Sequence, residues 1–225
     1  MKMFSFSGLV FLIDTVILGV FYYKLRSAKK KDPENKIVNI FLPTILILTS
    51  SYLVFTVAIL FYNQNPFLFS WLKIIGDAFL YLSFSFGIKI PFVMKYPKIN
   101  PKIPFVALLI ITFLSIMLNI FMLPRPLLND AGIIYWNLNP VSSWTLYIGA
   151  LMMWVPTSFI FFSTGLKAPK RERSHYFFMG TAFFMISVSG PLMVAVRYDS
   201  LVVLSQILMT IGFINLFAGM FVNKK

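Results

Sequence analysis

The 225-residue chain contains no cysteine and a single histidine, His175. Without cysteine there can be no disulfide, no thiolate nucleophile and no cysteine-ligated metal. One histidine cannot supply a usual histidine-rich metal centre or a bis-histidine haem site. Glycine-rich phosphate loops and the Gly-x-Ser-x-Gly nucleophile motif are also missing from the sequence. We therefore expect no metal, no other cofactor and no enzymatic activity.

Charged residues are scarce, at 12% of the chain, whereas hydrophobic residues make up 59% and the mean hydropathy is +0.83. A soluble domain of this size could not cover so much apolar surface with polar groups. The apolar residues fall into runs of about 20 residues or more, enough to cross a ~30 Å hydrocarbon core as helix. The predicted spans are 4–23, 37–62, 70–93, 103–123, 143–165, 175–196 and 200–222.

These runs lack the alternation of apolar and polar residues that marks the strands of a membrane barrel, so helices are predicted. The spans occupy most of residues 1–225, which leaves one membrane domain. The connections are mostly short, and short connections join antiparallel neighbours. The predicted fold class is an all-α integral membrane protein, a seven-helix bundle in sequential up-and-down order.

The basic residues gather in alternate connections between the spans. The first, third and fifth connections and the C-terminal tail carry Lys24, Arg26, Lys29, Lys30, Lys31 and Lys36; Lys95, Lys98 and Lys102; Lys167, Lys170, Arg171 and Arg173; and Lys224 and Lys225. Basic connections are retained in the cytoplasm, which predicts a multi-pass protein of the cell membrane with its N-terminus outside and its C-terminus inside. Contact with anionic lipid headgroups accounts for the net charge of +13, so we expect a lipid bilayer and no nucleic acid as partner.

The longest connection, Pro124–Ser142, mixes apolar and aromatic residues such as Leu127 and Trp136 with polar ones such as Asn129. This mixture suits a flap lying among the lipid headgroups, where Trp and Tyr prefer to sit. It suits equally a lid over a cavity that opens outward.

Prolines lie inside or near the ends of several spans, where they remove backbone hydrogen bonds and kink helices. Such breaks are tolerated in membranes, or they serve as hinges in a transporter. They are Pro43, Pro91, Pro104, Pro156 and Pro191.

The polar residues inside the spans are the candidate ligand-binding residues. Asp14 lies near the middle of the first span, where an isolated carboxylate costs several kcal/mol unless it is paired, hydrated or protonated. It is either a binding or gating site or a hydrogen-bonded contact between helices. Lys73 and Asp77 are four residues apart and so share a helix face. They form either a local ion pair, with Lys73 extending outward, or a polar pocket that includes Asn119.

The fifth connection and the sixth span, with Lys170-Arg171-Glu172-Arg173, Gly180 and Gly190-Pro191, resemble the seven-helix membrane sensor region of some prokaryotic histidine kinases. A retinal protein is not indicated, because the middle of the last span, 211–215, has no lysine. The resemblance implies a signalling role. No kinase domain follows Lys225, so signalling would need a separate protein partner.

The leading interpretation is a non-catalytic sensor, receptor-like protein or accessory subunit that binds a small or apolar ligand and couples to a partner through its basic cytoplasmic loops. One alternative is a small transporter or channel with Asp14 as an ionisable gate. The other alternative is a structural subunit of a membrane complex.

Overall fold

The computed structural model describes residues 5–96, 98–138, 140–195 and 197–221. Seven helical segments of these residues are long and apolar enough to cross a membrane, the third being α3 and α4 together. The predicted all-helical membrane class is thereby confirmed. The elements are α1 (Phe6–Lys31), α2 (Lys36–Phe61), α3 (Pro66–Gly87), α4 (Lys89–Lys95), α5 (Lys102–Phe121), β1 (Leu127–Leu128), β2 (Ile134–Tyr135), α6 (Pro140–Lys167), α7 (Lys170–Ala195) and α8 (Asp199–Phe221).

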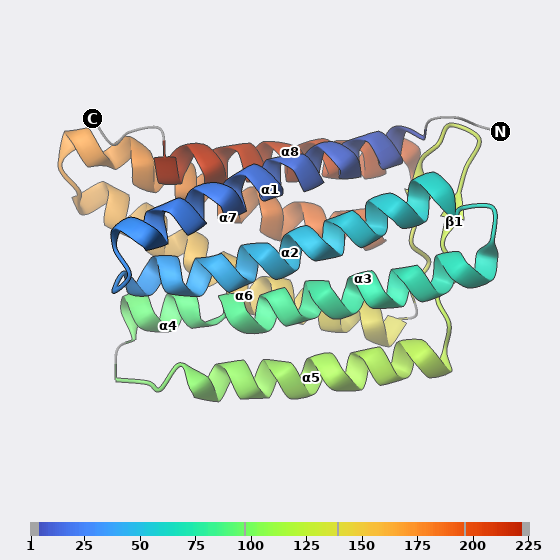
Figure 1. The fold of residues 1–225 in the computed structure, drawn as a ribbon, viewed down its shortest axis with the longest axis horizontal. Helices are drawn as coiled ribbons and strands as arrows, with labels where there is room; N and C mark the ends of the chain where they lie inside the picture. The colour runs from blue at the N-terminus through green and yellow to red at the C-terminus, as the bar shows by residue number, and fades with distance from the viewer. Residues whose placement is uncertain (1–4, 97, 139, 196, 222–225) are drawn as a thin grey trace.

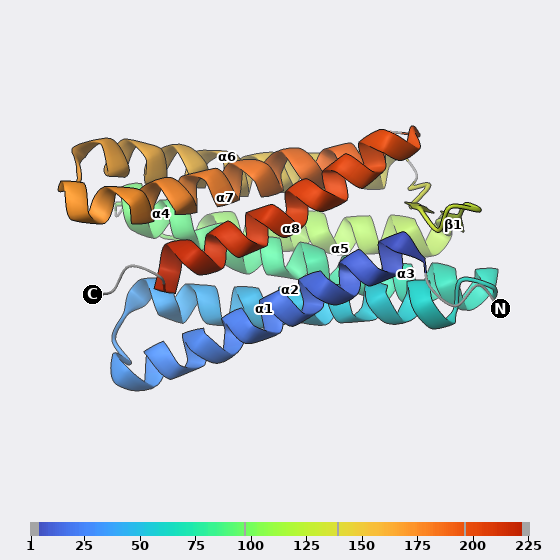
Figure 2. The same ribbon diagram turned by 90° about the horizontal axis from the view of Figure 1, so that it is seen from above.

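The helices run side by side along the long axis of the molecule and alternate in direction (Figure 1). Each spanning helix contacts the next one along the chain, and α1 contacts α8, so the bundle closes into a ring. Figure 2 shows α1 and α8 running side by side on the same side of the bundle. The first and last helices are therefore structural neighbours.

The two ends of the bundle differ in their connections (Figure 1). The end that carries the α1–α2, α4–α5 and α6–α7 connections is called the basic end, because the Lys- and Arg-rich segments gather there. The opposite end carries the antiparallel β1–β2 hairpin, in which Leu127 pairs with Tyr135 and Leu128 with Ile134. It is called the hairpin end.

Several helices extend beyond the predicted spans. The first was expected to end at residue 23 but continues to Lys31, because Lys and Arg are good helix formers and are favoured at a helix C-terminus. The fifth span, predicted as 143–165, is part of a longer helix, α6. Similarly, α7 begins at Lys170 rather than 175. Residues 4, 196 and 222 of the predicted spans lie outside the described residues.

The third span, predicted as one helix over 70–93, is interrupted at Ile88, between α3 and α4 (Figure 1). Pro91 lies in the first turn of α4, where its nitrogen cannot donate to the carbonyl of Gly87. The break falls just before the proline, where that hydrogen bond is lost.

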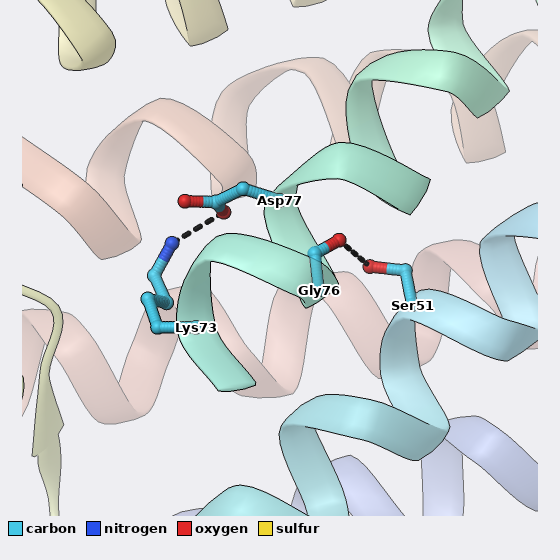
Figure 3. A network of polar contacts seen from close by, with 4 residues as sticks. All are labelled: Ser51, Lys73, Gly76 and Asp77. Carbon is cyan, nitrogen blue, oxygen red and sulfur yellow. Dashed lines mark hydrogen bonds and ion pairs between the residues drawn. The ribbon is translucent and has the colours of Figure 1, made fainter. Parts of the chain in front are cut away.

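The helices α2 and α3 pack closely at Gly76. The Ser51 hydroxyl donates to the Gly76 carbonyl oxygen over 2.8 Å (Figure 3). A Cβ atom on Gly76 would lie 2.2 Å from Cε1 of Phe55, which is inside contact distance. The glycine is therefore needed for this helix contact.

We predict that Gly76→Ala lowers the free energy of unfolding by about 1–3 kcal/mol, because the added methyl group overpacks the α2–α3 contact. The matched control is Gly19→Ala, since a Cβ atom there meets nothing within 4 Å. Gly19→Ala should leave stability unchanged or raise it slightly through helix propensity. Chemical unfolding of both variants in detergent measures the difference, and equal effects would contradict it.

Candidate functional site

A cavity lies between the helices in the half of the bundle nearer the hairpin end. Its volume is about 60 Å³, counted as the space open to the centre of a water molecule. It is bounded by side chains of α1, α2, α3, α6, α7 and α8 and by the connection after β2. The lining residues are mostly buried aromatic and aliphatic residues: Phe11, Leu48, Tyr52, Phe55, Lys73, Asp77, Leu80, Phe84, Trp136, Leu138, Trp154, Ile186, Gly190, Met193, Val194, Met209 and Phe213.

The cavity wall contains an ion pair between Lys73 and Asp77, both on α3 (Figure 3). Their side chains are only 3% and 1% exposed. One of the two alternatives from the sequence had Lys73 extending outward along the helix. The burial of its side chain excludes that position. Its ammonium group also lies 4.9 Å from the ring centre of Trp136 and 5.3 Å from that of Phe55. Aromatic faces at these distances stabilise a cation electrostatically.

Aromatic rings form much of the cavity wall. The ring centres of Phe55 and Trp136 are 5.0 Å apart, and Phe11 meets Trp136 edge to face at 5.7 Å. Two further lining residues, Phe84 and Trp154, meet edge to face at 5.9 Å. Edge-to-face packing of this kind holds large rings in fixed positions. The cavity is thus bounded by side chains with little freedom to collapse into it.

The connection after β2 covers the cavity at the hairpin end. Trp136 is 4% exposed and lines the cavity together with Leu138. The Ile134 amide donates to the Ser7 hydroxyl over 3.0 Å, which anchors the hairpin to the start of α1. Trp136 thus faces inward rather than the headgroup region, and this geometry favours the lid over the interfacial flap.

A second anchor of the lid lies at the start of α8. The Asn129 side-chain amide donates to the Asp199 carboxylate over 2.9 Å, and the Tyr135 hydroxyl donates to the same carboxylate oxygen. All three side chains are on the hairpin or on the helix end beside it. The lid is consequently held by polar contacts at two points of the bundle.

Asp14 does not line the cavity. Its carboxylate, 2% exposed, accepts a hydrogen bond of 2.7 Å from the Thr210 hydroxyl on α8. One turn nearer the hairpin end, Gln206 donates to the Ser7 hydroxyl over 2.9 Å. These contacts form a buried polar strip that joins α1 to α8 and closes the ring.

The four predicted site residues are therefore divided by the fold. Lys73 and Asp77 lie together on the cavity wall, whereas Asp14 lies at the α1–α8 contact. Asn119 is fully buried on α5 but is not among the lining residues. Tyr52, Trp136 and Trp154 also bring polar atoms to the lining. The sequence did not single out Trp154, because a tryptophan in an apolar run resembles any lipid-facing aromatic residue.

Within the described residues, no three His, Asp or Glu side chains gather in a way that could hold a metal ion. Comparisons with protein-family models, with curated proteins and with solved structures found no match to this chain.

We predict that Lys73→Met and Asp77→Leu each lower the free energy of unfolding by about 3–5 kcal/mol, because either change leaves one buried charge unpaired. The double variant should be more stable than at least one single variant, since it removes both charges at once. A double-mutant cycle by chemical unfolding in detergent measures this coupling. Strictly additive losses would contradict the pairing.

We predict that the Tyr135–Asp199 contact of the lid is lost at high pH. The Tyr135 hydroxyl donates a hydrogen bond to the Asp199 carboxylate, and this raises the pKa of Tyr135 above its usual range. Desolvation and the negative charge of Asp199 raise it further. The bond needs the protonated phenol, so it is present at neutral pH and lost as the pH rises through the raised pKa. Asp199→Asn should lower the pKa of Tyr135 in a titration followed by tyrosine NMR, with Tyr135→Phe identifying the signal. An unchanged pKa would rule out this anchor.

Proposed function

We propose that this protein is a non-catalytic membrane sensor or receptor-like subunit that binds a small or apolar ligand in the cavity beneath the lid. The observation that supports this most is the cavity itself, which combines aromatic walls, a buried Lys73–Asp77 pair and the inward-facing Trp136. Small-molecule sites are typically apolar hollows with a few placed polar groups.

The proposed orientation places the basic end in the cytoplasm and the hairpin end outside the cell membrane. The alternation of basic and non-basic connections supports it, and these connections lie at opposite ends of the bundle (Figure 1). The lid would then face the medium from which a ligand arrives. The basic end would face anionic headgroups and a protein partner inside.

A stack of rings offers a route for coupling between the two ends. Trp154, on the cavity wall, stacks on Phe183 at 5.2 Å, and Phe183 stacks on Phe161 at 5.4 Å. Phe161 lies next to Tyr176, with ring centres 6.4 Å apart. Both of these residues line a second cavity of about 460 Å³ at the basic end, beside Lys95. A shift of Trp154 on ligand binding would be passed to this surface, where a separate signalling partner would bind.

The experiment that separates a receptor from a transporter uses the natural absence of cysteine. Leu18, one turn from Asp14 on the same helix face, is 0% exposed. We predict that a Leu18→Cys variant in oriented vesicles is not labelled by a membrane-impermeant thiol reagent from both sides. Labelling from both sides would reveal a translocation path along α1 and would support a transporter gated by Asp14.

Two conservative substitutions serve as controls for sidedness. Ser27, on the basic end of α1, and Ser200, at the hairpin end of α8, are both exposed. Ser27→Cys should react only from the cytoplasmic side and Ser200→Cys only from the outer side. The reverse pattern would overturn the proposed orientation.

A further inference from the structure

Two buried polar atoms on the cavity wall have no hydrogen-bond partner among the described residues: Oδ2 of Asp77, an acceptor, and Nε1 of Trp154, a donor. Their side chains are 1% and 2% exposed. Leaving such an atom unpaired costs about 1–3 kcal/mol, and buried polar groups in proteins are nearly always paired with protein, water or ligand. Asp77 and Trp154 both line the cavity, so its wall includes one residue with an unpartnered acceptor and one with an unpartnered donor.

The charge of the cavity restricts that group. Lys73 bonds to the other carboxylate oxygen of Asp77, so the two charges offset one another. The remaining lining residues are uncharged types. An ionic ligand would bring a charge without a counter-charge into the bundle, at a cost of many kcal/mol. A neutral ligand avoids this cost.

The size and shape of the cavity favour more than a single water molecule. A site for one water needs about 10–15 Å³ by the same measure, and the cavity has about 60 Å³. The flat faces and edges of Phe11, Phe55, Phe84 and Phe213 bound the space. Such walls suit a compact apolar body, preferably a planar one.

We propose that the cavity binds a small uncharged molecule through one hydroxyl or amide group, which accepts a hydrogen bond from Trp154 Nε1 and donates one to Asp77 Oδ2. The apolar remainder of the molecule lies between the aromatic walls. This assignment of ligand class rests on the proposed sensor function, since it concerns the same cavity.

The test compares two probes of similar shape, phenol and toluene, with the whole chain in lipid nanodiscs. The chain has four tryptophans, so ¹⁵N-labelled indole groups give four NMR signals, and Trp154→Phe identifies that of Trp154. Saturable phenol binding should shift the Trp154 signal, with an affinity about tenfold higher than that of toluene. The tenfold preference should shrink in Trp154→Phe, which keeps a ring but loses the donor.

The matched control fills the cavity from α7. Gly190 lines the cavity, and a Cβ atom on it would meet only Met209 Cε, at 3.8 Å. Gly190→Leu should abolish the saturable binding of both probes. Gly190→Ala, whose methyl group makes only ordinary contacts, should fold normally and weaken the binding of both probes. This variant keeps the test valid if the leucine side chain prevents folding.

The outcomes separate the ligand class from the site. If phenol and toluene bind equally well and Gly190→Leu blocks both, the proposed hydrogen bonds to Trp154 and Asp77 are wrong, but the cavity does bind a ligand. If neither probe binds in a way that Gly190→Leu or Gly190→Ala weakens, the cavity holds only water, and both the ligand class and the proposed function fail. A shifted Trp154 signal with the tenfold preference supports both.

Discussion

The structure is organised around the burial of the Lys73–Asp77 ion pair inside a membrane protein. Removing two charges from water costs several kcal/mol each, and only close pairing and favourable surroundings offset the cost. Both partners come from one helix, four residues apart, so the pair can form without help from another helix. What the rest of the bundle supplies is the environment: the Phe55 and Trp136 rings beside the ammonium group and a lid above it.

That environment depends on contacts made far away along the chain. The lid is held at Ser7 on α1 and at Asp199 on α8, and the same two helices are joined by the strip from Ser7 to Asp14. Closing the ring of helices and covering the cavity therefore depend on the same two helices, α1 and α8. Ser7 takes part in both, since its hydroxyl accepts from Ile134 of the lid and from Gln206 of α8.

Much of the fold could be predicted because membrane spans depend on local composition. Apolar runs and alternating basic connections required no knowledge of tertiary contacts, and the spacing of Lys73 and Asp77 placed them on one helix face. The end of α1 at Lys31 was missed because solvated basic residues extend a helix beyond its apolar run. A kink near Pro91 was expected, but its position at Ile88 was not, because a proline only restricts where a helix can break.

The candidate site could be predicted only in part. The partner of Asp14, Thr210, is 196 residues away in sequence, and nothing local indicates it. Trp136 could face headgroups or a cavity, and its surroundings settle this only once the chain is folded. Cavity-facing and lipid-facing aromatic residues are equally apolar, so Trp154 was not distinguishable from the other residues of its span. A charged residue in an apolar span is evident from the sequence, whereas the apolar residues that line a cavity are not.

The most direct measurement is the ionisation state of Asp77 in the folded protein at neutral pH. The chain can be labelled with ¹³C at the aspartate carboxyl carbons, and Asp77→Asn identifies the signal in lipid nanodiscs. A carboxylate chemical shift that changes in Lys73→Met is expected, because the buried pair is ionised and mutually stabilised. The shift of a protonated acid, unaffected by Lys73→Met, would contradict the ion pair on which the neutral cavity depends.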